Sequence, residues 1–430
     1  MNQVSTADRN LAAEATSHAD EQTCRFCGSG DLQPFVDLGM SPLCETVLKA
    51  SELDQVEHFY PLNVRTCPEC LLVQLRSYVS AEEIFTEYAY FSSYSDSWLA
   101  HARSYCDQMV DTLGLTRDSF VVELASNDGY LLRNFVDEGI PCLGVEPAVN
   151  VAKAAVEAGI PTDVSFFGVE SAARLVAEHG KADLMIGNNV LAQVPDLNDF
   201  VGGIKTMLAP GGVVTIEWPH VLQLINENQF DTIYHEHFSY FSLHTHAKIW
   251  EAHGMRVFDV EQIPTHGGSL RVYGCHADDA GKPDTDRLRA VQQLEADAGL
   301  TTLEGYCGYT AQVEKTKRDL LAFLIEAKRQ GKQVVGYGAP GKGNTLLNYC
   351  GIRTDFLDYL VDRNPYKHGK FSCGTHIPIH APEKLAETKP DYILIMPWNL
   401  RTEIAAQLAY TKAWGTKLLV AVPELEILEG

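Results

Sequence analysis

The sequence contains no uninterrupted apolar run that could cross a membrane. A membrane-spanning helix needs about 20 consecutive apolar residues, and the hydrophobic residues, 45% of the chain, are dispersed along it. Residues 1–22 also lack the apolar stretch of a secretory signal and include several acidic side chains. We therefore expect a soluble, cytoplasmic protein without membrane contacts, in which residues 1–22 form a disordered tail.

Basic residues are scarce as well. Lysine and arginine number 34, against 57 aspartates and glutamates, which gives a net charge of −23. Because a field of this sign repels phosphate backbones, we do not expect nucleic acid as a partner. A small phosphorylated ligand is not excluded, since a few amides or basic groups can bind one locally.

The chain also lacks a disulfide framework. Of its eleven cysteines, four form two C-x-x-C pairs and the others follow no regular spacing. This distribution is typical of reduced thiols in the cytoplasm. The scattered cysteines are Cys44, Cys106, Cys142, Cys275, Cys307, Cys350 and Cys373.

The two paired motifs predict a metal site. A chain of 430 residues should hold roughly two or three domains, and the first contains the two C-x-x-C pairs. Four thiolates in a tetrahedral array suit Zn²⁺, and a full set of four leaves no open position, so we expect a structural zinc in residues 23–80. A redox dithiol is the alternative, but it would need only one pair. The zinc ligands are Cys24, Cys27, Cys67 and Cys70.

A nucleotide-binding pattern starts at Ser119. A short β-branched run is followed by the loop 125–129 and then by apolar residues at helical spacing. In a doubly wound sheet this loop lies under the nucleotide, and an acid at the end of the next strand, here Glu146, accepts the ribose hydroxyls. A later strand pattern ends in two asparagines. The residues that we assign to cofactor binding are Glu123, Ala125, Asn127, Gly129, Tyr130, Leu131, Glu146, Pro147, Asn188 and Asn189.

The order of these elements resembles class I S-adenosylmethionine-dependent methyltransferases. The segment 208–217 predicts a helix end, an L-x-P-G-G turn and a strand, which is a recurrent feature of that class. Ala125 and Asn127 replace the first two glycines of the usual E-x-G-x-G-x-G loop. Alanine needs little more room than glycine, and asparagine tolerates left-handed backbone angles. A doubly wound domain without a cofactor remains the alternative.

The tetrapeptide Tyr234-His235-Glu236-His237 offers acid–base chemistry. It places a possible base, a carboxylate and a hydroxyl within a few backbone steps, which is the set needed to remove a proton beside a carbonyl. A metalloprotease H-E-x-x-H motif is excluded, because Ser239 stands where its second histidine would be. The alternative is a surface loop in which histidines cluster without a function.

A second strand–loop–helix pattern spans residues 333–345. Its glycine-rich loop resembles a phosphate-binding turn, but it is not a Walker A box, because Asn344 stands where that motif needs lysine. Strand patterns at 356–362 and 391–397 indicate another parallel sheet. We therefore expect a helical linker and a second Rossmann-like α/β domain in residues 283–430. Its candidate ligand-binding residues are Lys342, Asn344, Asp362, Trp398 and Asn399.

The order of all these motifs resembles the bacterial deoxysugar C-methyltransferases. The resemblance extends from Cys24 to the C-terminus and includes the segment 265–273. It implies a structural zinc, S-adenosylmethionine bound in the core of residues 81–282, and methyl transfer to C3 of a thymidine-diphospho-4-keto-deoxysugar. The C-terminal domain is expected to help bind this nucleotide sugar.

The resemblance also suggests roles for individual residues. The methylated carbon must first lose a proton, for which His237 is the expected base, with Glu236 orienting it or contacting the sugar. Tyr234 would donate to the enolate oxygen, and His235 would face away if the segment is extended. Further candidates are Tyr88 or Tyr90 over the active site, and His266 and Arg271 as substrate contacts.

Two other functions are weighed against this hypothesis. A nicotinamide-dependent sugar dehydrogenase or epimerase would need a strict G-x-G-x-x-G loop or a Tyr-x-x-x-Lys pair, and the core has neither. A noncatalytic module that binds nucleotide sugars would not depend on the tetrapeptide. The sequence leaves open whether C3 carries an amine or a hydroxyl, which base the nucleotide has, and the stereochemical course. We expect a monomer or a weak dimer.

Overall fold

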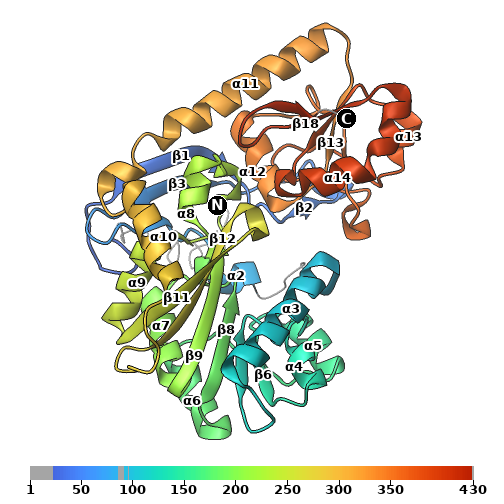
Figure 1. Cartoon of the computed structure of the whole chain (residues 1–430). Helices are drawn as coiled ribbons and strands as arrows, with labels where there is room; N and C mark the ends of the chain where they lie inside the picture. Colours follow the sequence, from blue (N-terminus) through green and yellow to red (C-terminus); the bar gives the residue numbers. More distant parts are fainter. Residues whose placement is uncertain (1–22, 86–91, 95, 429–430) are drawn as a thin grey trace, which may run out of the picture.

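The computed structural model describes residues 23–85, 92–94 and 96–428. Tyr88, Tyr90 and the tail of residues 1–22 lie outside the described residues. Figure 1 shows the central sheet and its helices at one end of the molecule and the C-terminal domain at the other. The N-terminal strands lie beside the junction between the two. Within the described part of the chain, no helix is both long and apolar enough to span a membrane.

The central domain is built on a seven-stranded sheet. Five neighbouring strands are parallel, and a hairpin of two further strands completes one edge; within it β12 runs antiparallel to the five and β11 runs parallel to them. This order confirms the class I methyltransferase topology expected from the sequence. Along the sheet the strands are β11 (Met255–Ile263), β12 (Ser269–His276), β9 (Leu208–Pro219), β8 (Ala182–Asn188), β5 (Val121–Leu124), β6 (Cys142–Val145) and β7 (Thr162–Asp163).

Helices cover both faces of this sheet because both faces are apolar. Neighbouring residues of β5 belong to different cores: Val121 packs with the helices of one face and Val122 with those of the other. Figure 1 shows the two helix layers on opposite sides of the strands. One layer holds α3 (Asp96–Leu113), α4 (Leu132–Asp137) and α5 (Val149–Glu157), and the other α6 (Val169–His179), α7 (Leu197–Met207) and α9 (Leu243–Ala252).

The L-x-P-G-G segment differs from its expected form. Strand β9 begins at Leu208 without a separate turn, and Leu208 pairs with Ala182 while Val213 pairs with Leu184. The extra residues on β9 form an irregularity in the ladder. Gly211, with a φ angle of 79°, allows this excursion because the left-handed region suits glycine.

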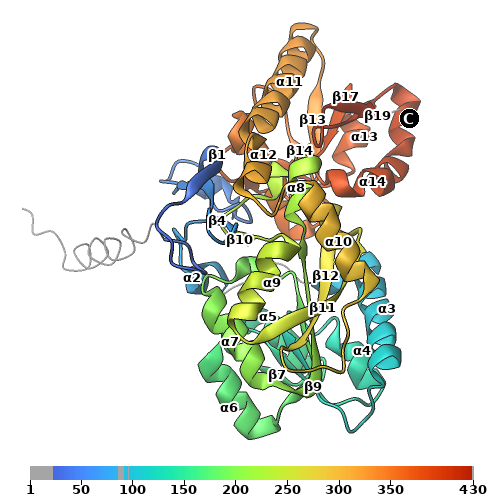
Figure 2. The same cartoon turned by 60° about the vertical axis from the view of Figure 1, so that its left-hand side comes forward.

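The N-terminal module forms a four-stranded antiparallel sheet, and its last strand comes from the central part of the chain. Figure 2 shows β4 and β10 side by side, and their pairing joins Gln74 to Ser239. The segment 234–237 is thus attached directly to the N-terminal module. In order, the strands are β1 (Gln33–Ser41), β3 (Tyr60–Thr66), β4 (Val73–Leu75) and β10 (Ser239–Tyr240).

The C-terminal domain is a second α/β unit. Its six-stranded sheet is parallel except for the last strand, which confirms the expected Rossmann-like architecture. The strands in order are β16 (Ile379–His380), β14 (Leu360–Val361), β13 (Val334–Tyr337), β17 (Tyr392–Ile395), β18 (Lys417–Val420) and β19 (Glu426–Leu428), and the helices are α12 (Gly341–Cys350), α13 (Lys384–Thr388) and α14 (Arg401–Gln407).

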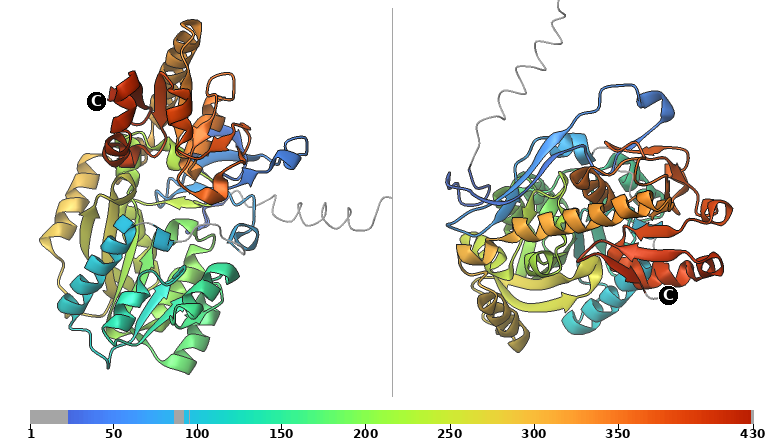
Figure 3. Two further views of the ribbon diagram at one scale, coloured as in Figure 1. Left: turned by 90° about the vertical axis from the view of Figure 1, so that its right-hand side faces the viewer. Right: turned by 90° about the horizontal axis from the view of Figure 1, so that it is seen from above.

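The linker is helical and contacts both the N-terminal module and the C-terminal domain. It contains α10 (Asp286–Asp297) and the long α11 (Tyr309–Arg329), which Figure 3 shows crossing above the N-terminal strands. Tyr309 stacks on Phe35 of β1, with their ring centroids 4.8 Å apart. In addition, β15 (Phe371–Ser372) pairs with β2 (Val47–Leu48) of the N-terminal module. The remaining short helices are α2 (Ala81–Phe85) and α8 (Val221–Asn226).

Candidate active site

A cavity of about 460 Å³ lies at the carboxyl ends of β5, β6 and β8. This is the edge at which open α/β sheets bind their ligands, and the volume suits a small-molecule site. Residues from the central loops, from the segment before β10 and from the C-terminal domain line it together. Of the expected site residues, those in its wall are Ala125, Asn127, Tyr130, Glu146, Pro147, Asn188, Asn189, Tyr234, His237, His266 and Lys342.

The loop after β5 has the backbone of a glycine-rich turn. Ala125, Asn127 and Gly129 have φ angles of 53°, 51° and 76°, all in the left-handed region. Glycine enters this region freely and asparagine tolerates it, whereas alanine is strained there by about 1–2 kcal/mol. The loop therefore keeps the backbone conformation of a glycine-rich turn, although alanine and asparagine replace two of the usual glycines.

Glu146 is held in place by this loop. Its Oε2 accepts a hydrogen bond from Asn127 N at 2.8 Å, and its Oε1 accepts one from Ala148 N at 2.9 Å. Burial raises the pKa of the carboxyl, and the two amides oppose this shift. Each oxygen keeps a free lone pair, so the carboxylate can still accept hydroxyl groups of a ligand in the cavity.

Three residues that we expected to bind the cofactor do not line the cavity and lie behind its wall. Glu123 is buried, and burial together with the neighbouring Glu146 raises the pKa of its carboxyl well above its usual range. A Cβ atom on Gly129 would come within 2.7 Å of the Ile160 side chain. Leu131 is fully buried. These residues support the loop from behind.

The amides at the end of β8 point to a ligand. Both side-chain polar atoms of Asn188 and the Oδ1 of Asn189 are buried without a hydrogen-bond partner among the described residues. Such groups are rarely left unpaired in folded proteins. They line the same cavity as Glu146, so a molecule with its own donors and acceptors fits here.

Several aromatic residues of the cavity wall belong to none of the motifs found in the sequence. Trp98 on α3 stacks on Tyr130, with ring centroids 6.1 Å apart, and meets His266 edge-on at 5.5 Å. Phe166 and Phe167 follow β7 at the same edge of the sheet. Their place after a third parallel strand could have identified the two phenylalanines. No sequence signal distinguishes Trp98 from a core residue.

The tetrapeptide 234–237 is a tight turn and not an extended segment. The His237 amide donates to the Tyr234 carbonyl at 2.9 Å. A turn brings its first and last side chains together, and the rings of Tyr234 and His237 lie 4.1 Å apart. Both line the cavity.

His237 has one ring nitrogen fixed as a donor. Its Nδ1 lies 3.0 Å from the Thr232 carbonyl, which can only accept, so Nε2 carries the lone pair. Burial lowers the pKa of this imidazole to about 4; the hydrogen bond to Thr232 opposes the shift, and the charges of His266 and Lys342 add to it. The ring is therefore neutral at physiological pH and able to accept a proton.

The middle residues of the turn face the N-terminal module. His235 is buried edge-on against Tyr60 of β3, with centroids 5.7 Å apart. Glu236 accepts a hydrogen bond from the Cys44 thiol at 3.4 Å. Burial and the neighbouring Glu45 raise the pKa of Glu236 to about 7. The group that orients His237 in this structure is the Thr232 carbonyl.

His266 and Arg271 occupy different environments. His266 lines the cavity with a φ angle of 56°, and the next residue, Gly267, lies so close to Trp398 that a Cβ atom would come within 2.5 Å of that ring. Arg271 lies behind the wall, where it is buried in ion pairs with Glu217 at 2.5 Å and with Glu261 at 3.1 Å.

Lys342 extends from the start of α12 into the cavity. Its Nζ donates to Asn399 Oδ1 at 2.8 Å and lies 4.7 Å from the centre of the Trp398 ring. Trp398 in turn donates through Nε1 to Asp231 at 2.7 Å. Burial raises the pKa of Asp231 to about 6, while Lys342 and this hydrogen bond oppose the rise.

The glycine-rich loop of the C-terminal domain contacts the N-terminal module. Gly341 N donates to Glu45 Oε1 at 3.2 Å, and Asn344 Nδ2 donates to the Cys44 carbonyl at 2.5 Å. Asp362 accepts from Ala339 N at 2.7 Å within its own domain. Neither Asn344 nor Asp362 lines the described cavity, whereas Glu45 does, although no sequence signal marks it.

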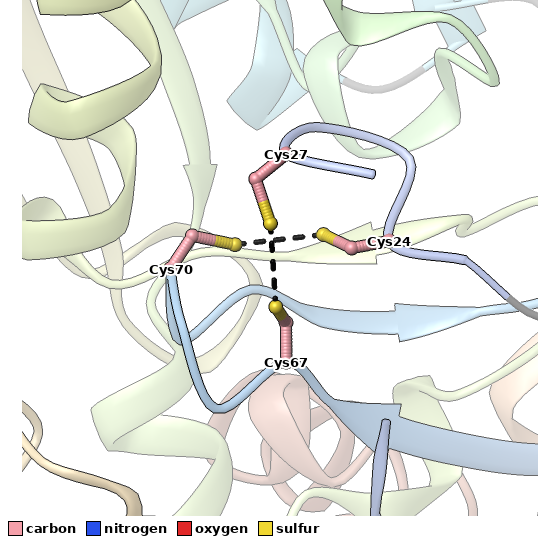
Figure 4. Close-up of side chains that lie close together, drawn as sticks. All are labelled: Cys24, Cys27, Cys67 and Cys70. Carbon is pink, nitrogen blue, oxygen red and sulfur yellow. Dashed lines mark hydrogen bonds between the residues drawn. The ribbon is translucent and has the colours of Figure 1, made fainter. Parts of the chain in front are cut away.

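The four paired cysteines converge on one point. Figure 4 shows their sulfur atoms facing each other, with Cys24 3.5 Å from Cys70 and Cys27 3.5 Å from Cys67. All four lie within 4.8 Å of one another. A tetrahedral zinc with bonds of about 2.3 Å needs sulfur separations of about 3.8 Å, so the set fits this metal. Gln74 of β4 donates to Cys24 Sγ at 3.1 Å, as an outer partner of a thiolate would.

Comparison with known families covers all three parts of the chain. A model described as "Putative zinc binding domain" matches residues 24–85. A methyltransferase domain matches residues 98–260, and a C-methyltransferase C-terminal domain matches residues 264–423. The first match contains the cysteine cluster, the second contains most of the central sheet, and the third contains β12, the linker and the C-terminal sheet.

A curated relative matches nearly the whole chain. C-methyltransferase NovU of Streptomyces niveus is 35% identical over 409 residues, which are 95% of this chain and 97% of NovU. Among solved structures, magnesium protoporphyrin IX methyltransferase of Synechocystis with bound SAH aligns with 41% of this chain and 82% of its own, at 13% identity and a TM-score of 0.33. The PH0226 protein of Pyrococcus horikoshii aligns with 44% of this chain and 95% of its own, at 12% identity and a TM-score of 0.35.

Proposed function

The chain belongs to the S-adenosylmethionine-dependent C-methyltransferases, and from this premise we propose that it methylates C3 of a thymidine-diphospho-4-keto-deoxysugar. In this proposal His237 first removes the proton from C3. Family membership decides against the nicotinamide-dependent dehydrogenase, and it makes an enzyme a better account than a noncatalytic module.

One observation carries the proposal: a single cavity contains both the cofactor loop and the acid–base pair. Ala125, Glu146 and Asn188 form one part of its wall, and Tyr234 and His237 form another. Removal of a proton beside a carbonyl needs a base close to the group that traps the carbanion. The shared cavity meets this requirement.

The cofactor part of the cavity supplies binding and orientation. Bound S-adenosylmethionine provides an electrophilic methyl group. Glu146 is held by two backbone amides and would accept the ribose hydroxyls. The unpaired amide of Asn188 and the Oδ1 of Asn189 would bind the amino-acid end.

The proton would go to Nε2 of His237, since Nδ1 is fixed by Thr232. A low pKa makes the resting imidazole neutral, and the negative charge that develops on the substrate would stabilise the imidazolium as it forms. Tyr234 stacks against this ring and would donate its hydroxyl to the enolate. Glu236 lies behind the turn, where its protonated form would reduce the negative charge near the site.

The substrate would span the boundary between the central and C-terminal domains. His266 of the central domain and Lys342 of the C-terminal domain both line the cavity. Trp398 and Asn399 lie beside Lys342. Support for a nucleotide-linked sugar comes from the resemblance of the motif order and from this position. The zinc is proposed to be structural, because four thiolates close its coordination sphere.

The test is a direct assay of the reaction. Purified protein is incubated with S-adenosylmethionine carrying a deuterated methyl group and with a panel of thymidine-diphospho-4-keto-deoxysugars, and the products are read by mass. The proposal predicts transfer of one labelled methyl group to a panel member. Failure of the protein to bind S-adenosylmethionine by calorimetry, or binding without any methylated sugar, would contradict it.

A further inference from the structure

The cavity has an unusual balance of charge for a site that forms an anion. Among the lysines and arginines that the structure describes, Lys342 alone lines it. The carboxylic acids in the same wall outnumber this cation. They are Glu45, Glu82, Glu146, Asp196 and Asp199.

The direct contacts of the Lys342 ammonium are with neutral groups. Its Nζ donates to the Asn399 carbonyl oxygen at 2.8 Å and lies over the Trp398 ring. An ammonium has three donors, and this is the one hydrogen bond of the Nζ to the described residues. Its other donors are available to a ligand in the cavity.

The position of Lys342 is fixed before any ligand arrives. Trp398, which lies beneath the ammonium, is buried and anchored to Asp231 at 2.7 Å. Close packing of Gly267 against the same ring joins this unit to the His266 segment. A charge that is already in place needs no reorganisation when an anion forms beside it, which is the condition for strong electrostatic catalysis.

Lys342 also acts on the base. Its positive charge contributes to the low pKa of His237, which means that the two groups lie within electrostatic reach of each other. His266, from the segment 265–267, is the other titratable neighbour that acts on His237 in this way. A cation and a neutral base thus face one cavity from two domains.

We propose that Lys342 is a catalytic residue whose ammonium donates to the carbonyl oxygen of the substrate and stabilises the enolate. This inference rests on the proposed function and assigns to Lys342 a role in the chemistry instead of in nucleotide binding. In the step concerned, the C3–H bond breaks and its proton bonds to Nε2 of His237. The electron pair moves toward the carbonyl, and the negative charge on its oxygen is paired with Lys342.

The test separates proton removal from methyl transfer. Wild type, Lys342→Met and Lys342→Arg are incubated in D₂O, without S-adenosylmethionine, with the thymidine-diphospho-4-keto-deoxysugar that the wild type methylates fastest. Exchange at C3 is followed by NMR, and kcat and KM for methylation are measured separately. Lys317→Met is the matched control, because Lys317 also lies over a ring, that of Tyr349 at 4.4 Å, but on α11 and outside the cavity wall.

Loss of one preorganised donor to an oxyanion lowers rates by about 10²–10³. We expect Lys342→Met to slow both C3 exchange and kcat by about this factor. Lys342→Arg should retain at least ten times more activity than Lys342→Met. The control variant, Lys317→Met, should match the wild type. Calorimetric binding of S-adenosylmethionine by each variant shows that it is folded. A Lys342→Met protein with a raised KM but unchanged kcat and exchange would overturn the inference, whereas a wild type without methylation would overturn the proposed function.

Discussion

At the scale of single residues, His237 is distinguished by how it is held. Its Nδ1 donates to the Thr232 carbonyl and its ring stacks against Tyr234, so the imidazole has one orientation and one tautomer. Removal of this base by His237→Asn should lower turnover by about 10² or more, as is typical for lost general base catalysis. Binding of S-adenosylmethionine, measured by calorimetry, should be unchanged.

His253→Asn provides the matched control for this variant. His253 also donates through Nδ1 to a backbone carbonyl, that of Ile249 at 2.8 Å, but it lies at the end of α9 and outside the cavity wall. Its variant should retain wild-type turnover. Equal turnover in wild type and His237→Asn would remove His237 as the base.

The raised pKa of Glu236 predicts that the stability of the protein depends on pH. Its pKa is raised from 4.5 to about 7, mainly by burial, so the folded protein binds this proton more tightly than the unfolded chain. The stabilisation from this proton is complete below pH 4.5 and is lost as the pH rises to about 7. Glu236→Gln cannot ionise and should therefore unfold with a free energy about 1–3 kcal/mol higher than the wild type at pH 8.

Urea denaturation at several pH values measures this difference. The difference should disappear well below pH 4.5, where the wild-type carboxyl is protonated in both the folded and the unfolded state. Glu251→Gln, on the exposed side of α9, serves as a control without such a trend. A Glu236→Gln protein less stable than the wild type at pH 8 would contradict the account.

At the scale of elements, the loop after β5 combines backbone strain with a place in the cavity wall. Ala125 has a φ angle of 53°, which a β-branched side chain adopts only with large strain. Ala125→Val should lower stability by about 1 kcal/mol or more, and its larger side chain should weaken S-adenosylmethionine binding by at least about tenfold.

Lys389→Val separates these two effects. Lys389 has a φ angle of 50° at the end of α13, and it does not line the described cavity. The Lys389→Val variant should be less stable than the wild type but should bind S-adenosylmethionine with the same affinity. Unchanged affinity in Ala125→Val would show that the cofactor does not lie against this loop.

The same element shows what sequence patterns can and cannot predict. The β-branched run of β5 and the asparagine at position 127 were sufficient to predict a strand and a left-handed turn, because both follow from local backbone preferences. The role of the second glycine-rich loop was harder to predict. Gly341 and Asn344 belong to a sequence pattern that resembles a phosphate-binding turn. In the structure, however, the backbone amide of Gly341 donates to Glu45, and the side-chain amide of Asn344 donates to the Cys44 carbonyl. A contact between residues so far apart in sequence leaves no local signal.

The site was predictable to a similar extent. Motif spacing predicted a base and a cofactor loop, each within a short run of residues, and it identified two cysteine pairs that the structure brings together. Trp98 and Glu45 enter the cavity wall only through tertiary packing. Conversely, Arg271 resembled a ligand contact in the sequence, and its buried ion pair with Glu217 becomes visible only when β9 and β12 are paired.

In the whole molecule, the cysteine cluster is connected through one sheet to the turn that contains the proposed base. Strand β4, which follows the second cysteine pair, pairs with β10, and β10 begins two residues after His237. Removal of the metal should therefore disturb the turn as well as the N-terminal module. Cys67→Ser, or treatment with a zinc chelator, should lower turnover by about tenfold or more and reduce the thermal midpoint.

The metal content of each protein is measured by atomic absorption. The wild type should contain one zinc per chain, and Cys307→Ser, at an exposed cysteine outside the cluster, should retain both metal and turnover. Full turnover after complete loss of zinc would show that the module does not support the active site.

Replacement of the hydrogen at C3 by the methyl group can be observed with a substrate that is deuterated at C3. The measurement is NMR and mass analysis of the product formed in H₂O with S-adenosylmethionine. The product should carry a methyl group bonded to C3 and no deuterium. A product that keeps the deuterium and carries its methyl group on oxygen, nitrogen or another carbon would contradict the account.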